Sequence, residues 1–340
     1  MHNYKYGHHI LITMATKLVV FVVAALVVSV GVGAFFLINN SDGPDTEGDI
    51  TVVDDRGKSV TFSESPKRIV SLGSSFTDTL VMLGCMEQIF AVDQSSITRL
   101  VGSGIEYDGL SSKIAMTSGN PANSLEDIQI YNADCVIVWN FSMYGAGITA
   151  LEDAKVKVLA LYPSDIGSVK NVIEIIGKVM GKSDEASALI DEINSTMENI
   201  TELAKTKAGA SYGNYKRLYV ELDTVSHTSP GTATITGSML DMLGVNYLAK
   251  WKGSTGSLFY NPDDIWTFNP EIMIFMGPVA AGYDVLRTGS GTISVTGALI
   301  DIYNNSTGDG FNGNWASATP SFIKGLVYLY ELIYGEAYEP

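Results

Sequence analysis

Cysteine and histidine are scarce in this chain. Its 340 residues include two cysteines and four histidines. Two cysteines cannot build a disulfide scaffold or a cysteine-rich metal cluster. Three of the histidines, His2, His8 and His9, lie near the N-terminus, which leaves His227 alone in the remainder. A bare Zn²⁺ or Mn²⁺ site needs several converging His and carboxylate side chains, so the sequence argues against one.

Positive charge is also scarce. Lys and Arg total 21 against 37 Asp and Glu, which gives a formal net charge of −16. Nucleic-acid binding needs clustered Lys and Arg to neutralise phosphates, so this class of partner is excluded. Only 17% of residues are charged while 46% are hydrophobic, which is typical of a folded chain. The length predicts one large or two medium domains.

One long hydrophobic run lies near the N-terminus. Residues 18–38 carry no charge and are long enough to cross a bilayer, which takes about 20 residues. Lys5 and Lys17 precede the run and acidic residues follow it, so the positive-inside rule places residues 1–17 in the cytoplasm. Residues 39–49 then form a linker to an extracytoplasmic domain. A cleaved signal peptide is the alternative, but its apolar region usually spans only about 7–15 residues.

The two cysteines, Cys85 and Cys135, each lie in an apolar stretch. Two buried free thiols are the simpler interpretation, and a disulfide between them is the alternative. Sequons for Asn-linked glycosylation give weak support for an external domain, because they are frequent by chance. They lie at Asn140, Asn194, Asn199, Asn304 and Asn305.

The chain beyond residue 49 alternates strand and helix patterns. Residues 50–53 and 59–62 flank a turn signal and predict a hairpin. A strand at 69–72, a helix at 77–83 and a strand at 89–92 then form a βαβ unit, which implies a parallel sheet. Further strands are expected at 135–139, 156–161, 217–222, 272–275 and 299–303, with a short extended piece at 248–249. Helices are expected at 125–131, 148–154, 165–180, 238–243, 263–266 and 321–334.

A long helix is predicted between two similar halves. Residues 184–207 keep helical spacing of apolar residues throughout. On either side, residues 125–138 and 263–275 repeat one order of an acidic helix start, a turn and a strand. The fold class is therefore α/β, with two βαβ-type lobes and mainly parallel sheets joined by one long helix, after an N-terminal transmembrane helix. We assign 50–182 to the N-lobe, 183–207 to the interlobe helix and 208–340 to the C-lobe.

Several blocks resemble the periplasmic-binding-protein family for iron-siderophores and vitamin B12. The blocks are residues 66–93, 124–138, 228–231 and 239–244. The resemblance implies a monomeric, non-catalytic subunit that needs no cofactor and holds a ferric siderophore or cobalamin in a cleft between two lobes. It delivers this chelate to an ABC-importer permease with its ATPase. A single linking helix implies a small closure on ligand.

The resemblance also assigns roles to individual residues. Glu126 and Asp263 match the acidic residues that dock each lobe on permease arginines, although the family usually has Glu at the second position. Both could instead be acids that favour a helix N-terminus. Ligand contacts are expected in strand-end loops, with the aromatic stretch 139–144 the richest. They are Ser75, Phe76, Asn120, Trp139, Met143, Tyr144, His227, Tyr260, Arg287 and Trp315.

Two other classes compete with a transport protein. An enzyme is disfavoured, because the sequence has neither a Gly-x-Ser-x-Gly nucleophile elbow nor a phosphate-binding P-loop. A membrane-anchored surface sensor on the same fold remains the alternative, and it would not need the docking acids.

Overall fold

The computed structural model describes residues 49–101, 105–222, 228–275, 299–301 and 316–339. Within these ranges no helix combines the length and apolar content needed to cross a membrane. The predicted span 18–38 lies outside the described residues. The described residues belong to one compact unit that begins at Asp49.

The described chain opens with the predicted hairpin. Strands β1 (Ile50–Val53) and β2 (Ser59–Phe62) pair antiparallel. The turn between them is fixed by Asp54, which is buried and accepts hydrogen bonds from Arg56 Nη2 at 2.6 Å and from the Ala160 amide at 3.2 Å. The second bond attaches the hairpin turn to the edge strand of the following sheet.

The first sheet is parallel, as predicted, and has five strands. Its order is β5-β4-β3-β6-β7. The strands are β3 (Ile69–Leu72), β4 (Ile89–Asp93), β5 (Ile114–Met116), β6 (Cys135–Trp139) and β7 (Lys157–Leu161). The sequence did not predict β5, because three residues are too few to show a periodic pattern. All four residues of β3 are buried, which is typical of a parallel strand covered on both faces.

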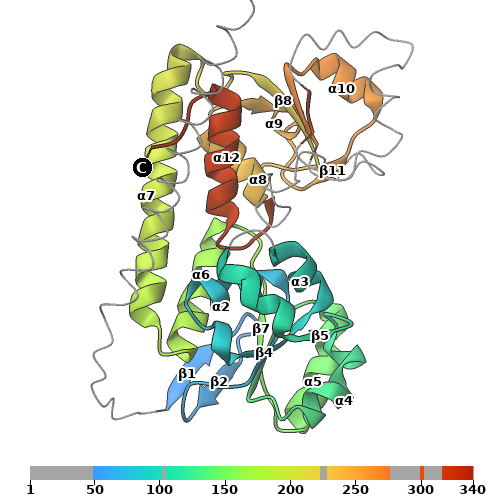
Figure 1. Ribbon diagram of the computed structural model, residues 1–340. Helices are drawn as coiled ribbons and strands as arrows, with labels where there is room; N and C mark the ends of the chain where they lie inside the picture. The colour runs from blue at the N-terminus through green and yellow to red at the C-terminus, as the bar shows by residue number, and fades with distance from the viewer. Residues whose placement is uncertain (1–48, 102–104, 223–227, 276–298, 302–315, 340) are drawn as a thin grey trace, which may run out of the picture. The chain divides into compact units, whose positions relative to one another are not determined.

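Helices cover both faces of this sheet (Figure 1). On one face Ile137 and Leu159 belong to the same core cluster as α2 (Ser74–Met82) and α6 (Ile166–Val179). On the other face the alternate residues Val136 and Val158 pack with α4 (Leu125–Ile130) and α5 (Gly145–Asp153). Helix α3 (Gln94–Leu100) follows β4. The alternation of strand residues between two clusters follows from the period of two in a β-strand.

The long helix is observed as α7 (Ser183–Ala208), within one residue of its predicted start and end. Its first half packs on α6, where Ala186 lies against Gly177 and Asn194 binds the Lys170 ammonium. Its last turn contacts the C-terminal helix α12 (Phe322–Tyr334), since the Tyr334 hydroxyl donates to the Ala204 carbonyl at 3.4 Å. Helix α7 therefore contacts α6, which precedes it directly, and α12, which lies more than a hundred residues later in the sequence.

The second sheet is also parallel, with the order β10-β8-β12-β13. Its strands are β8 (Arg217–Glu221), β10 (Asn246–Tyr247), β12 (Ile272–Phe275) and β13 (Leu299–Asp301). A separate antiparallel pair consists of β9 (Thr228–Ser229) and β11 (Leu258–Phe259). The helices are α8 (Ile235–Met242), α9 (Leu248–Lys252) and α10 (Pro262–Phe268).

The expectation of an extended piece at 248–249 was wrong. These two residues begin α9, which ends at Gly253 with φ of 71°. Glycine adopts this left-handed conformation without a Cβ clash and so ends the helix. Leu and Ala are both good helix formers, so the two residues by themselves favour a helix. A two-residue piece is too short to show a helical period in the sequence.

The two sheets repeat one anchoring arrangement at the start of their central strands. Arg68 immediately precedes β3. Its Nη2 donates to the Tyr131 carbonyl at the end of α4, and the Asp134 carboxylate accepts a hydrogen bond from the Arg68 backbone amide. In the second sheet Arg217 Nε donates to the Asn269 carbonyl at the end of α10, and Glu271 accepts from the Arg217 amide. The internal similarity seen in the sequence thus reflects a shared set of contacts. In each case an Arg satisfies carbonyls at a helix C-terminus, as the helix dipole favours.

Helix α5 offers a matched test of close packing. A Cβ on Gly147 would lie 2.4 Å from the backbone nitrogen of Ala122, whereas a Cβ on Gly145 would meet nothing within 4 Å. We expect Gly147→Ala to lower the free energy of unfolding by about 1–3 kcal/mol, the range for overpacked sites. Gly145→Ala should change the free energy of unfolding by less than about 1 kcal/mol, and we expect a small stabilisation because Ala favours a helix over Gly. Urea denaturation measures both, and equal effects would contradict the packing argument.

Candidate functional site

Five aromatic side chains gather where β3, β6 and β7 end. These residues, called the aromatic cluster below, are Phe76, Trp139, Phe141, Tyr144 and Tyr162. The strands end at one level, because Leu72 is in register with Val138 and Trp139 with Leu161. The carboxyl edge of a parallel sheet is where α/β proteins bind ligands. The aromatic cluster is therefore the candidate site.

The rings of the cluster contact one another in a fixed geometry. Trp139 lies between Phe76, with centroids 5.2 Å apart, and Phe141, which stacks on it at 5.3 Å with an interplanar angle of 3°. Tyr162 approaches Trp139 and Phe141 edge-on at 6.2 and 5.8 Å, and Tyr144 approaches Phe141 at 5.3 Å. Offset-stacked and edge-to-face pairs at these distances are favourable.

A glycine makes room for the indole. The ideal Cβ position on Gly73 would lie 2.4 Å from Trp139 Nε1, so any side chain there would collide with the ring. Gly73 also has φ of +156°, a conformation that L-residues rarely adopt. The Gly73-Ser74 turn after β3 thus allows Trp139 to lie close to the start of α2.

Hydrogen bonds hold the loops that carry the cluster. The Asn140 backbone N–H donates to the Leu161 carbonyl at 2.9 Å, and the Asn140 side-chain Nδ2 donates to the Asp55 backbone carbonyl at 3.1 Å. Asp55 in turn accepts a hydrogen bond from the Tyr162 amide through its carboxylate. The β1–β2 turn therefore positions Tyr162, and the rings are arranged before any ligand arrives.

Exposure is graded across the cluster. Phe76 is fully buried, Trp139, Phe141 and Tyr144 are half-buried, and Tyr162 is 47% exposed. Met143, in the same loop, is 74% exposed. Since Phe76 is buried and Phe141 stacks on Trp139, a ligand would meet Phe141, Tyr162 and Met143 first. This surface is apolar and aromatic, and it suits flat unsaturated groups.

The other predicted ligand residues are placed differently. Ser75 is buried beside Phe76 in the first turn of α2, and Asn120 caps a short 3-10 helix at Pro121–Asn123 through the Ala122 amide. Tyr260 is 5% exposed and packs in the core of the second half. His227, Arg287 and Trp315 lie outside the described residues.

Tyr162 is not among the ligand residues predicted from the sequence. It directly follows the strand predicted at 156–161, just as Trp139 ends its neighbour, so the strand-end rule could have found it. Its place in the cluster depends on the register between β6 and β7, which the sequence does not contain.

The cysteines carry no reactive thiol. Cys85 and Cys135 are both free and buried, as the simpler interpretation of the sequence expected. Burial raises the pKa of Cys85 to about 11 and raises the pKa of Cys135 as well. Within the described ranges, no group of three His, Cys, Asp or Glu side chains forms a possible metal site.

The two predicted docking acids occupy equivalent positions. Glu126 is the second residue of α4 and Asp263 the second residue of α10, and both are exposed. The neighbouring acid Asp264 behaves differently, because it forms an ion pair with Lys252. Both helices are followed by an Asn in left-handed conformation, Asn132 and Asn269, each with φ of 50°.

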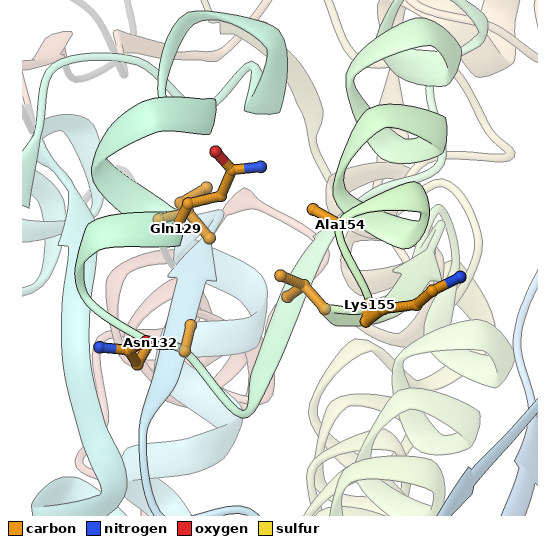
Figure 2. Close-up of a pocket in the computed structure, with 7 residues that line it drawn as sticks. Gln129, Asn132, Ala154 and Lys155 are labelled. Carbon is orange, nitrogen blue, oxygen red and sulfur yellow. The ribbon is translucent and has the colours of Figure 1, made fainter.

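A separate pocket of about 310 Å³ lies at the opposite, amino edge of the first sheet (Figure 2). It opens between the C-terminal end of α4, with Gln129 and then Asn132 in the turn after it, and the turn after α5, with Ala154 and Lys155. These turns precede β6 and β7 and so face away from the carboxyl edge. The pocket is formed by two helix ends and holds no convergent set of reactive groups, so we do not assign the ligand to it.

Comparison with known proteins decides the family. The sequence profile described as periplasmic binding protein matches residues 69–291, which is well over half of the chain. The chain belongs to the periplasmic binding protein family. This confirms the family resemblance drawn from the sequence. Proteins of this family bind solutes and perform no catalysis, so the chain is not an enzyme.

A curated relative comes from Bacillus subtilis. It is named as an uncharacterized ABC transporter substrate-binding lipoprotein, YvrC, and is 25% identical over 237 residues. The match covers 68% of this chain and 70% of the relative.

Solved structures of similar fold include two with ligands. The molybdate-bound MolA of Haemophilus influenzae has a TM-score of 0.63 at 17% identity and covers 84% of this chain and 91% of its own. SirA of Staphylococcus aureus, complexed with staphyloferrin B, has a TM-score of 0.60 at 18% identity and covers 83% and 98%. At these identities the likeness concerns the fold alone.

Proposed function

We propose that this periplasmic binding protein captures an organic metal chelate, a ferric siderophore or a corrinoid, and delivers it to an ABC-importer permease. The observation that carries the proposal is the aromatic cluster at the carboxyl edge of the first sheet. The exposed ring of Tyr162 and the half-buried ring of Phe141 offer stacking surface to a macrocycle or a catecholate ring. A bare ion or a small oxoanion would instead need converging charged groups or hydrogen-bond donors.

The names of similar proteins support this ligand class. One is described as a heme binding protein, HmuT, and SirA was solved with staphyloferrin B. MolA, by contrast, was solved with molybdate. The fold therefore accommodates both chelates and oxoanions, and the aromatic surface of this chain is the feature that favours a chelate.

The proposed partner is a permease with its ATPase, as the relative's description as an ABC transporter protein suggests. Glu126 and Asp263 would meet basic side chains on that permease. Both acids are exposed and, among the described residues, neither forms an ion pair. Charged groups at the rim of an interface mainly steer association and fix register.

The proposed location is outside the cytoplasm, with residues 18–38 as a membrane anchor. The relative is named a lipoprotein, whereas this chain has no cysteine before Cys85 to carry a lipid near its N-terminus. An apolar run of this length would supply the attachment in a different way.

A thermal-unfolding screen of the full chain in mild detergent tests the ligand class. The panel contains hemin, cobalamin, a ferric hydroxamate and a ferric catecholate, with molybdate as the oxoanion control. A ligand present at 100 times its Kd should stabilise the protein by about 2.7 kcal/mol. Stabilisation by molybdate alone, or by no compound, would contradict the proposal.

A matched pair of variants then tests the site. Tyr162→Ala removes an exposed ring of the cluster. Loss of one stacking contact should weaken chelate binding by about two- to tenfold, since aromatic pairs contribute about 0.5–1.5 kcal/mol beyond their area. Trp251→Ala is the control, because Trp251 is similarly exposed at 44% but packs on Phe268 in the second half. Chelate affinity is measured by fluorescence titration. Equal affinities for the two variants would show that the aromatic cluster is not part of the ligand site.

A further inference from the structure

A buried carboxyl group joins two segments that are far apart in the sequence. Asp78, in α2, is fully buried, and its Oδ2 accepts a hydrogen bond from the Ser321 amide at 3.0 Å. Its Oδ1 accepts from the Ser321 hydroxyl at 2.9 Å and from the Tyr107 hydroxyl at 2.6 Å. The Tyr107 and Ser321 hydroxyls are themselves 3.0 Å apart. These three residues are called the Asp78 cluster below.

The Asp78 cluster lies at the N-terminal end of α12. Ser321 is the N-cap of α12, yet its side chain forms no capping hydrogen bond within that helix. Asp78 accepts from the Ser321 amide itself, while the Phe322 and Ile323 amides donate to the Thr319 and Pro320 carbonyls. A negative charge near a helix N-terminus is favoured by the helix dipole. Burial raises the pKa of Asp78, while the hydrogen bonds from Tyr107 and Ser321 act in the opposite direction. A buried carboxyl is stable only with such complete hydrogen bonding.

The two ends of the cluster belong to different halves of the fold. Helix α2 packs on the first sheet, and Phe76, two residues before Asp78, contacts Trp139 in the aromatic cluster. Helix α12 is attached to the second half, where the Tyr334 hydroxyl donates to the Leu243 carbonyl at 2.7 Å and Lys216 Nζ donates to the Ile333 carbonyl at 2.7 Å. The Asp78 cluster thus bridges the ligand-site helix of one half and the C-terminal helix of the other.

We infer that the Asp78 cluster is a strap that limits movement of the two halves about α7. A single linking helix resists bending but still permits rocking about one line of contact. A second, rigid attachment away from that helix removes this freedom. The inference concerns the protein without ligand and does not depend on which solute it binds.

A second link beside the cluster is weaker. Lys324 Nζ lies 2.5 Å from Glu106 and 5.4 Å from the Tyr107 ring. Both charged side chains are about one-third exposed, at 35% and 38%. Ion pairs of this exposure contribute little because water screens them. The buried hydrogen bonds of Asp78 therefore provide most of the restraint.

Distance measurement between spin labels tests the strap. Labels are attached to the full chain at Asp153→Cys in α5 and Thr267→Cys in α10, two exposed helical positions in different halves. The buried native thiols do not compete for the label. In this background Asp78→Ala should broaden the distance distribution or shift it by more than about 2 Å, the size of a domain rearrangement.

The control removes a buried hydrogen bond that stays within one half. The hydroxyls of Ser71 and Thr77 lie 2.8 Å apart in the first half, so Ser71→Ala should lower stability and leave the distance distribution unchanged. Should Asp78→Ala not fold, Ser321→Ala gives the same test more gently, because it keeps the backbone bond to Asp78. Unchanged distributions in the strap variants, or equal broadening in Ser71→Ala, would overturn the inference.

Discussion

Uptake through the partner permease should fall to background when Glu126 and Asp263 are both changed to lysine. The change places positive charge where basic permease side chains are proposed, and like-charge contacts at an interface cost several kcal/mol. Each 1.4 kcal/mol is a tenfold change in affinity, so the loss of docking should exceed about 100-fold. Neither side chain contacts the aromatic cluster, and affinity for the chelate should not change.

Adjacent acids provide the controls for this reversal. Asp127→Lys and Asp264→Lys make the same change of charge one residue further along each helix. They should retain most of the uptake, and Asp264→Lys should lose only the exposed ion pair with Lys252. Uptake is measured in whole cells with radiolabelled chelate, and binding with purified protein. Full uptake by the double reversal would refute docking through these two acids, and lost chelate affinity would refute a pure docking role.

The second large effect is expected at Gly73. A Cβ there would lie 2.4 Å from Trp139 Nε1 and 3.0 Å from Phe76 Cδ2, so Gly73→Ala must displace the indole from its place between Phe76 and Phe141. Overpacking of this kind typically costs about 1–3 kcal/mol. Because the ring that supports Phe141 moves, chelate affinity should fall by more than tenfold as well, by the arithmetic of about 1.4 kcal/mol per decade.

Near-ultraviolet circular dichroism, denaturation and chelate titration together measure this effect. Gly119→Ala is the control, since a Cβ at that position meets nothing within 4 Å. The indole signal, the stability and the affinity should change together in Gly73→Ala alone. An unaltered indole signal with lower stability would show that the backbone, and not Trp139, absorbs the added methyl group.

The repeated βαβ pattern allowed much of the fold to be predicted. Strands β6 and β12 and helix α7 were expected within one or two residues of their observed bounds, because each carries its signal in consecutive residues. The elements that escaped prediction are short. Strands β5 and β9 have three and two residues, and their conformation depends on pairing with distant segments.

The site was predictable only in part, for a related reason. Trp139 ends a recognisable strand and Tyr144 follows it, and both were expected at its carboxyl end. The burial of Tyr260 depends on how the second half packs, which no local pattern reveals. The bond between Asp78 and Ser321 joins residues 243 positions apart, and neither residue has an unusual neighbourhood in the sequence.

The two inert cysteines make this protein suitable as an optical sensor. With Cys85 and Cys135 buried and their pKa values raised, a maleimide dye will react at an introduced thiol and at no native one. Met143 is 74% exposed beside the aromatic rings, so a dye attached at Met143→Cys would experience a change in polarity when a solute covers the cluster. The same chain that is proposed to capture a scarce chelate could then report its concentration in growth medium as a fluorescence signal.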